Sequence, residues 1–324
     1  MIMMKRNSAS WLVAAVTITA LAPDASSAQT APDGRSCHAV TGNPRLGGVV
    51  LFGGARVCGR DVLADSTLWV LQGPLWARID IPFNGTREDV LLGFDSRRGT
   101  LLLYGGRNGP TVHRDTWEFD GRQWRSLTMT GPGPIEHAAA AYDSVRGRWV
   151  LFGGGSRSGA WPRETWEWDG TRWSANSAIG PVARVGHSMA AASNGGVYLY
   201  GGFNESGSLT DFWRWNGEQW SRIDSAGPAH TEGPALFALR GDTIALVAAQ
   251  ARGEPNAGNY RVWRWAENRW APWGNAGPPG RIGQGIAYDP LRRRIVLYGG
   301  AAQGAQTSLS DVWEFDGTSW HRIR

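Results

Sequence analysis

The sequence predicts an all-β fold, a six-bladed β-propeller built from four-stranded antiparallel blades. Two tryptophans seven positions apart recur six times at intervals of about fifty residues, and such a period is typical of a chain built from copies of one supersecondary unit. A short apolar run stands upstream of each pair, and in five of the six copies it ends in two glycines. The tryptophan pairs are Trp69/Trp76, Trp117/Trp124, Trp166/Trp173, Trp213/Trp220, Trp263/Trp270 and Trp313/Trp320.

Each copy contains four short strand-like segments, which are clearest in the third copy. Residues 137–142 are mostly small, residues 149–152 form a continuous apolar run, residues 165–168 alternate, and residues 172–173 open a fourth segment. A continuous apolar run bounded by turn residues suits a strand that is buried on both faces. The Asp-Gly and Asn-Gly pairs between the third and fourth segments are strong hairpin signals.

The glycine pairs after the second segment permit a positive φ and a close approach of the backbone. The fifth copy departs from this pattern, because Ala248 and Ala249 stand where the other copies have glycine. The fifth copy is therefore where this chain differs most from a regular repeat. The glycine pairs are Gly53-Gly54, Gly105-Gly106, Gly153-Gly154, Gly201-Gly202 and Gly299-Gly300.

An apolar strand, a double glycine and then two spaced aromatic residues resemble the Kelch repeat, although Trp stands here where that family often has Tyr at the first aromatic position. The resemblance covers roughly residues 35–324 and implies four-stranded blades around a central channel. It implies a single propeller domain at residues 29–324. The implied blades are residues 35–80, 86–127, 134–176, 183–224, 231–273 and 281–324.

The N-terminus is predicted to be a secretory signal peptide, residues 1–28. Lys5 and Arg6 precede an apolar stretch at residues 11–22, and small residues follow up to Ala28, near which we expect cleavage. The stretch is too short for a comfortable membrane span. We therefore expect an exported protein, periplasmic or extracellular, with no membrane span in the mature chain. The alternative is a buried N-terminal helix.

The chain has two cysteines, Cys37 and Cys58. Cys37 begins the first strand of blade one, and Cys58 lies just past the end of the antiparallel second strand, so the two should be neighbours. Because export permits a disulfide, we predict one between them. Two free thiols are the alternative.

Composition gives little reason to expect a nucleic-acid partner. The formal net charge is +5, and removing Lys5, Arg6 and Asp24 with the signal peptide leaves +4. Lys5 is the one lysine of the chain, and an Arg-only bias of this kind often follows genomic base composition. Apart from Arg292-Arg293-Arg294, which is predicted to lie in a turn between strands, the sequence has no basic run with interleaved aromatics of the kind that indicates nucleic-acid binding.

The loops between the second and third strands and the linkers between blades share one face of such a propeller, called the long-loop face below. Binding residues often lie on long loops held by a rigid scaffold. Arginine is frequent here and recognises carboxylate and phosphate through paired donors, which suits an anionic ligand; the alternative is an ordinary solvated surface. The candidate ligand-binding residues are Arg107, His113, Arg114, Arg157, Trp161, Arg163 and Trp273, with further arginines at Arg56, Arg60, Arg184, Arg252 and Arg281.

A second candidate site is the mouth of the central channel. Alignment of the copies predicts one shared position, which would ring this mouth, for His38, Asp89, His137, His187, Gly233 and Gln284. Asp89, His137 and His187 are the candidate catalytic residues, because imidazoles beside a carboxylate can transfer protons. A recurring histidine also has a simpler structural role, in which it bonds a neighbouring loop.

Familiar catalytic motifs, phosphate-binding glycine loops and paired-cysteine metal sites are absent from the sequence, so we predict no metal and no cofactor. Some Kelch relatives are copper oxidases that resemble galactose oxidase, with a cysteine–tyrosine crosslink. That site does not carry over, since both cysteines here are expected to pair with each other. Other relatives are sialic acid mutarotases, but their site cannot be matched residue by residue.

Fold alone does not give function. The leading interpretation is an exported, monomeric binding module that recognises a protein or an anionic or glycan ligand on the long-loop face. One alternative is an enzyme acting on an acidic sugar at the channel mouth, as a mutarotase or an epimerase does. The other is a structural envelope protein.

Overall fold

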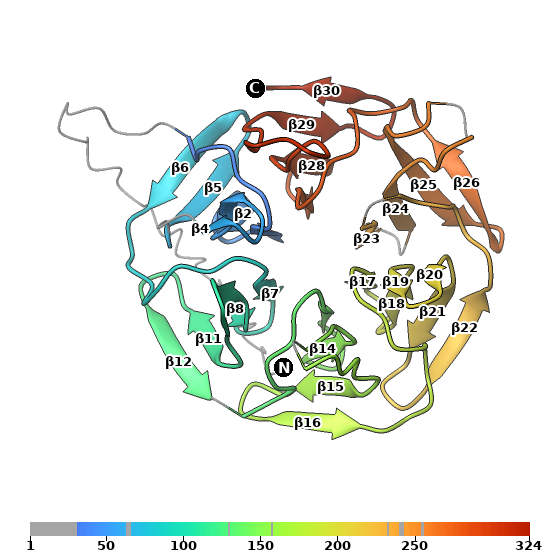
Figure 1. Cartoon of the computed structure of the whole chain (residues 1–324). Helices are drawn as coiled ribbons and strands as arrows, with labels where there is room; N and C mark the ends of the chain where they lie inside the picture. The colour runs from blue at the N-terminus through green and yellow to red at the C-terminus, as the bar shows by residue number, and fades with distance from the viewer. Residues whose placement is uncertain are drawn as a thin grey trace, which may run out of the picture. The chain divides into compact units, whose positions relative to one another are not determined.

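Six four-stranded sheets are arranged in a ring, and the chain passes through them in order (Figure 1). Within every sheet the neighbouring strands are antiparallel, as in the pairing of Leu151 with Trp166 in the third sheet. This arrangement confirms the predicted six-bladed β-propeller.

The computed structural model describes residues 31–62, 66–128, 130–156, 158–231, 233–239, 243–253 and 256–324. The predicted signal peptide, residues 1–28, lies outside these ranges, and so does Arg157. Every regular element in these ranges is a strand, and none of the described residues forms a helix that could cross a membrane.

The two inner strands of each blade differ in burial. The second strands are buried along almost their whole length, because each lies between two neighbouring blades, which explains their continuous apolar runs. The innermost strands are β1 (Ala39–Asn43), β7 (Leu91–Asp95), β13 (Ala139–Asp143), β17 (Ser188–Ala191), β23 (Ala235–Ala238) and β27 (Gly285–Asp289). The second strands are β2 (Gly48–Phe52), β8 (Thr100–Tyr104), β14 (Arg148–Phe152), β18 (Val197–Tyr200), β24 (Ile244–Ala249) and β28 (Arg294–Tyr298).

The two outer strands of each blade carry the recurring tryptophans, whose rings fill the seams between blades. The third strands are β5 (Leu68–Gln72), β11 (Thr116–Phe119), β15 (Thr165–Trp168), β21 (Phe212–Trp215), β25 (Tyr260–Ala266) and β29 (Val312–Phe315). The outermost strands are β6 (Leu75–Ile79), β12 (Trp124–Thr128), β16 (Trp173–Asn176), β22 (Trp220–Asp224), β26 (Arg269–Trp273) and β30 (Trp320–Arg322).

The glycine pair ends the second strand for a steric reason. Gly54 has a φ of 104°, and a Cβ built on it would lie 2.8 Å from the Cβ of His38. Its backbone N–H donates to the carbonyl of Arg87 in the next blade at 2.8 Å. Glycine therefore allows the chain to turn onto the neighbouring blade.

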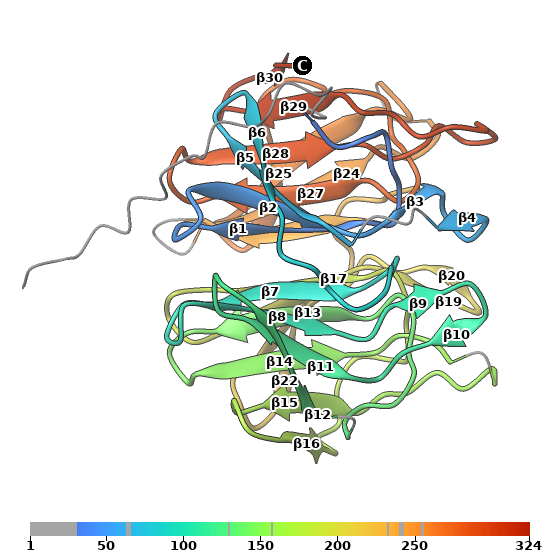
Figure 2. The same ribbon diagram turned by 90° about the vertical axis from the view of Figure 1, so that its left-hand side faces the viewer.

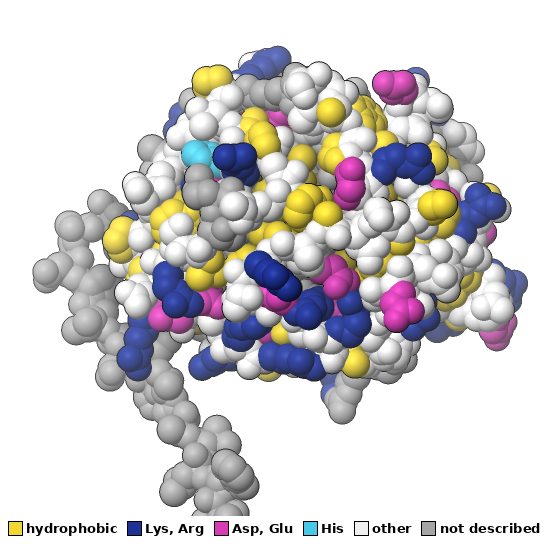
Figure 3. Space-filling model, turned by 90° about the horizontal axis from the view of Figure 1, so that it is seen from below, with side chains coloured by type: hydrophobic (Ala, Val, Ile, Leu, Met, Phe, Trp, Pro, Cys, Tyr) yellow, Lys and Arg dark blue, Asp and Glu magenta, His cyan; other side chains and the backbone are white. Residues whose placement is uncertain are grey.

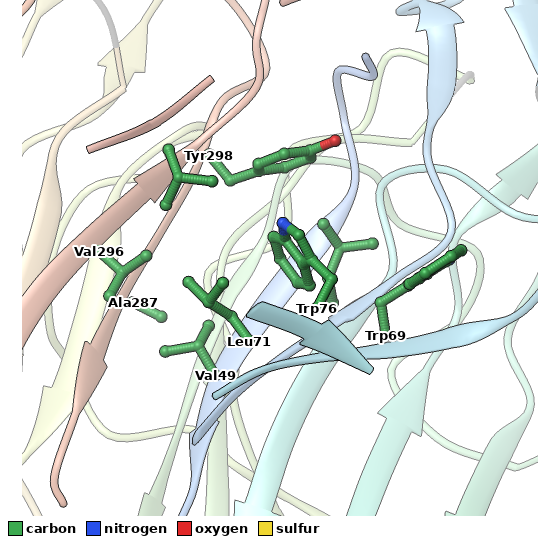
Figure 4. Close-up of a cluster of buried hydrophobic side chains, with 9 residues drawn as sticks. Val49, Trp69, Leu71, Trp76, Ala287, Val296 and Tyr298 are labelled. Carbon is green, nitrogen blue, oxygen red and sulfur yellow. The ribbon is translucent and has the colours of Figure 1, made fainter. Parts of the chain in front are cut away.

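The ring closes between blade one and blade six without an exchanged strand among the described residues. The Gly300 N–H donates to the Arg35 carbonyl at 2.9 Å, as Gly54 does to Arg87. The Tyr298 hydroxyl lies 2.9 Å from the carbonyl oxygen of Pro32. Figure 4 shows the apolar side chains of this seam, which come from Val49, Trp69, Leu71 and Trp76 of blade one and from Ala287, Val296 and Tyr298 of blade six.

The predicted disulfide is confirmed. Cys37 and Cys58 are joined, with their Cα atoms 5.5 Å apart and a sequence separation of 21. The bond ties the first strand of the ring to the loop after β2, so the terminal blade has a covalent link that the other blades lack.

Blades two, four and six each contain a buried arginine paired with an aspartate. Each guanidinium also donates to the carbonyl of the first glycine of its pair, as Arg184 does to Gly201 at 2.9 Å. Burial alone would raise the pKa of Asp211, but hydrogen bonds from Arg184 and Trp213 outweigh it and hold this pKa below its usual value. The three pairs are Arg87–Asp115, Arg184–Asp211 and Arg281–Asp311.

Arginines on the face opposite the long loops bind neighbouring blades. The guanidinium of Arg45 donates to the Gly99 carbonyl at 3.1 Å, and that of Arg97 donates to the Ser144 carbonyl at 2.8 Å. Figure 3 shows basic side chains gathered along the lower edge of the molecule, which is this face. These arginines therefore connect successive blades.

Candidate functional site

The long-loop face carries three short hairpins, formed by loops between the second and third strands of blades one, two and four. Figure 2 shows all three projecting from the same side of the ring. Backbone bonds close their bases, as where the His113 N–H donates to the Gly106 carbonyl at 2.8 Å. The hairpins are β3 (Ala55–Val57) with β4 (Asp61–Val62), β9 (Arg107–Asn108) with β10 (Thr111–Val112), and β19 (Phe203–Asn204) with β20 (Gly207–Ser208).

At the base of the second hairpin, Arg107 is surrounded by carboxylates at the channel mouth. Its Nη2 lies 3.2 Å from Glu88 Oε1, and its Nε lies 3.2 Å from Asp89 Oδ2 and 3.2 Å from Glu136 Oε1. The Gly59 N–H donates to Glu88 Oε2 at 3.0 Å. This ionic cluster therefore joins segments of blades one, two and three.

The charge balance of the cluster does not favour an anion. Three carboxylates face one guanidinium, so the cluster is negative overall when all are ionised. Glu88 is only 1% exposed, and burial raises its pKa, although the Gly59 N–H and the charge of Arg107 oppose this. The structure thus places Arg107, a predicted ligand-binding residue, among carboxylates instead of on a free basic rim.

The three candidate catalytic residues do not come together. Asp89 and His137 are neighbours, with His137 Nδ1 3.9 Å from Asp89 Oδ1. His187 is instead 5% exposed, and its ring packs edge-on against Phe152 between blades three and four. Burial, with the charge of Arg184, lowers the pKa of His187 to about 3, so its imidazole is neutral near pH 7.

The sequence alignment of the repeats, which gave these residues one shared position, is shifted by one residue in several blades. The backbone φ is 53° at Cys37, 54° at Asp89 and 57° at His137, and it is also positive at Gly186 and Gly283. These five residues are therefore the true equivalents. His38, His187 and Gln284 each follow one of them, and both histidines are buried.

The predicted basic rim is smaller than the sequence suggested. Arg184 and Arg281 are buried in the ion pairs described above. Arg114 and Arg163 are exposed, whereas His113 is half-buried, and burial, with the charge of Arg87, lowers its pKa.

Trp273 does not lie on a long-face loop as predicted. It is the last residue of β26, and its ring packs edge-on against Phe315 across the seam between blades five and six. It lines a cavity there with residues of the strands, such as Arg264 and Ile295. Its seam position arises because the fourth strand of blade five continues further than the repeat indicated.

Blade three presents a surface with a different character, formed by Trp161, Arg163 and Ile179 and called the blade-three surface below. Ile179 is 89% exposed, the highest value among the exposed large hydrophobic residues of the described chain. It lines a cavity of about 380 Å³ together with Arg163 and Glu164. Trp161 is half-buried in the same loop as Arg163. An apolar side chain held in water beside an arginine is typical of a protein-binding surface.

Sequence reasoning missed Glu88, Glu136 and Ile179. The two glutamates directly precede Asp89 and His137, so a correct alignment of the repeat would have placed them beside the channel mouth. Ile179 carries no signal of this kind, because an isolated isoleucine in a linker does not show whether it is covered.

No protein-family model matches the chain. Over 122 residues the chain is 31% identical to tRNA wybutosine-synthesizing protein 4 of Emericella nidulans. The match covers 34% of this chain and 11% of that protein. The chain thus spans only about a tenth of this relative, whose activity is therefore not carried over. The fold defines the class of the protein, a six-bladed β-propeller.

Proposed function

We propose that this chain is a binding module that recognises a protein partner through the blade-three surface of its long-loop face. The observation that carries the proposal is Ile179, a large apolar side chain left 89% exposed beside Arg163 in a cavity. Burying such a side chain against a partner is favourable by about 1.5–3 kcal/mol. Arg163 in the same cavity, and Trp161 two residues before it in the loop, are of the residue types that most often dominate binding energy.

We also propose that the propeller is of the Kelch type and that the mature protein is exported. The Kelch assignment is supported by the double glycines at the ends of the second strands and by the paired tryptophans. Export is supported by the basic and apolar order of residues 1–28 and by the disulfide, since disulfides persist mainly in oxidising compartments. A monomer without a nucleic-acid partner is part of the same proposal.

At the blade-three surface, the proposed function favours a protein partner over the anionic ligand that the arginine-rich loops suggested. Arg107 is enclosed by carboxylates, and Arg184 and Arg281 are paired and buried, so three of the expected anion-binding groups are already engaged. Exposed apolar area remains at Ile179 and at Val182, which is also exposed. Apolar area is what a protein surface can cover.

The test compares capture by the wild-type mature protein, the Ile179→Asp variant and a matched control, Leu75→Asp. Leu75 is also an exposed apolar residue, at 67%, but it opens the outer strand β6 of blade one. Each protein is immobilised and incubated with envelope extract, and the retained proteins are quantified by mass spectrometry.

We expect one or more proteins to be retained by the wild type and by Leu75→Asp and lost with Ile179→Asp. The wild type and both variants should have the same melting temperature, because both substituted side chains are exposed. Identical retained sets for wild type and Ile179→Asp would refute the location of the site.

A further inference from the structure

A polar cavity opens on the long-loop face between blades five and six, with a volume of about 430 Å³. This volume lies within the usual range of small-molecule sites. Side chains of Thr231, Gln250, Arg252 and Gln303 line it, and Gly258 forms part of its wall. Among the described residues that line the cavity, none is acidic.

Blade five departs from the repeat directly before the residues that line this cavity. Because Ala248 and Ala249 replace the glycine pair, β24 continues to Ala249, which pairs with Tyr260 at the start of β25. In the other blades the second strand stops before the glycines. The next residue, Gln250, forms a β-bridge with His230, as the equivalent residue of the other blades does with its own linker, and it lies at the base of the long loop.

Backbone hydrogen bonds hold Gly258, a residue of the cavity wall, against Gln250 and against the linker to blade six. The Gly258 N–H donates to the Gln250 carbonyl at 2.9 Å, and the Gly280 N–H donates to the Gly258 carbonyl. The blade-five loop is thereby tied to the linker that leads to blade six. The cavity wall is therefore formed before any ligand arrives.

Gln250 marks the floor of the cavity. Its side chain is 2% exposed, and within the described part of the chain its Oε1 has no hydrogen-bond partner. Buried polar atoms are nearly always bonded, so an unpartnered carboxamide oxygen in a polar cavity indicates a missing donor. A ligand hydroxyl is such a donor.

Arg252 supplies the charge at the rim. It is exposed, and no carboxylate among the described residues pairs with it. A guanidinium offers paired donors that match a carboxylate. Gln303 and Thr231 add an amide and a hydroxyl, which can both donate to and accept from a hydroxylated molecule.

We propose that this cavity binds a small hydroxylated carboxylate, with the carboxylate on Arg252 and a hydroxyl donating to Gln250 Oε1. The site uses no residue of the blade-three surface, so it goes beyond the proposed protein-binding function. The two proposals are tested independently, because a negative result for one does not contradict the other.

The experiment is calorimetric titration of the mature protein with sodium gluconate and, separately, with sorbitol, which has the same carbon chain length but no charge. The variants are Arg252→Met and Gln250→Leu. The control is Arg122→Met, an exposed arginine in the turn between β11 and β12 that lies outside the cavity. Arg252 is exposed, so its variant remains informative if Gln250→Leu fails to fold.

We expect gluconate to bind the wild type and Arg122→Met alike. It should bind each of the two cavity variants about tenfold or more weakly, since each loses a hydrogen bond to the ligand. Sorbitol should bind the wild type more weakly than gluconate by a similar factor. No gluconate binding to the wild type, or equal binding to Arg252→Met, would overturn the site. Equal binding of sorbitol and gluconate would overturn the assignment of a carboxylate.

Discussion

The buried histidines make the stability of this propeller sensitive to mild acid. His38 and His187 are almost fully covered, and burial lowers the pKa of each from 6.5 to about 3. The charges of Arg35 and Arg184, respectively, contribute to this lowering after burial. The folded protein therefore binds fewer protons than the unfolded chain in this pH range.

This difference in bound protons decides whether the free energy of unfolding rises or falls with pH. A base whose pKa is lower in the folded state contributes its full stability above its unfolded pKa, 6.5, and loses it as the pH falls toward the folded pKa. Between pH 7 and pH 5 each histidine should lower the free energy of unfolding by about 2 kcal/mol, at about 1.4 kcal/mol per pH unit below 6.5. The two together should lower it by about 4 kcal/mol.

The assay is urea unfolding followed by tryptophan fluorescence at pH 7, 6 and 5. His187→Phe keeps a ring beside Phe152 but cannot be protonated, so it should remove about half of the pH-dependent loss. The control is His321→Phe, because the side chain of His321 is largely exposed. Glu88, whose pKa is raised by burial, contributes with the opposite sign but equally in every variant.

Equal losses between pH 7 and pH 5 in the wild type and in His187→Phe would refute the reasoning. That result would mean that His187 takes up a proton in the folded state as readily as in the unfolded chain. A reduced loss in His321→Phe would equally show that the pH dependence does not come from burial.

Two further predictions concern the internal links. Reducing the disulfide of blade one should lower the free energy of unfolding by about 3 kcal/mol, the value expected for closing a loop of this length, and a melt with and without reductant measures it. Asp211→Asn should lower the free energy of unfolding by about 3–5 kcal/mol, because Arg184 would keep a buried charge without its partner. The control is Asp80→Asn, in the exposed pair with Arg78, which should change this free energy by less than about 1 kcal/mol. Urea unfolding of both variants measures the two values.

The repeat could be interpreted from sequence because its signals are local. A continuous apolar run, a glycine pair and an Asp-Gly turn each act within a few residues, and their recurrence indicated both the strands and the number of blades. The disulfide was predictable for the same reason, since Cys37 and Cys58 lie on either side of one hairpin.

The candidate site was much less accessible from sequence. Whether an arginine is a free rim group or a buried partner depends on side chains from other strands, as Arg184 shows with Asp211, and Arg107 with Glu136 of the next blade. Aligning the histidines of the repeat with one another predicts His187 at the channel mouth, whereas its side chain is buried. The backbone φ values identify Asp89 and His137 as the equivalent pair.

The sequence by itself therefore determined the fold, the number of blades and the covalent link, because backbone pairing and turn geometry follow from short-range pattern. Only the tertiary structure decided which arginines are free to contact a ligand and that Ile179 is exposed. It also decided that Gln250 and Gln303 line one cavity. Those properties depend on desolvation by residues about fifty positions apart in the chain, and a repeat pattern does not encode burial by a neighbouring blade.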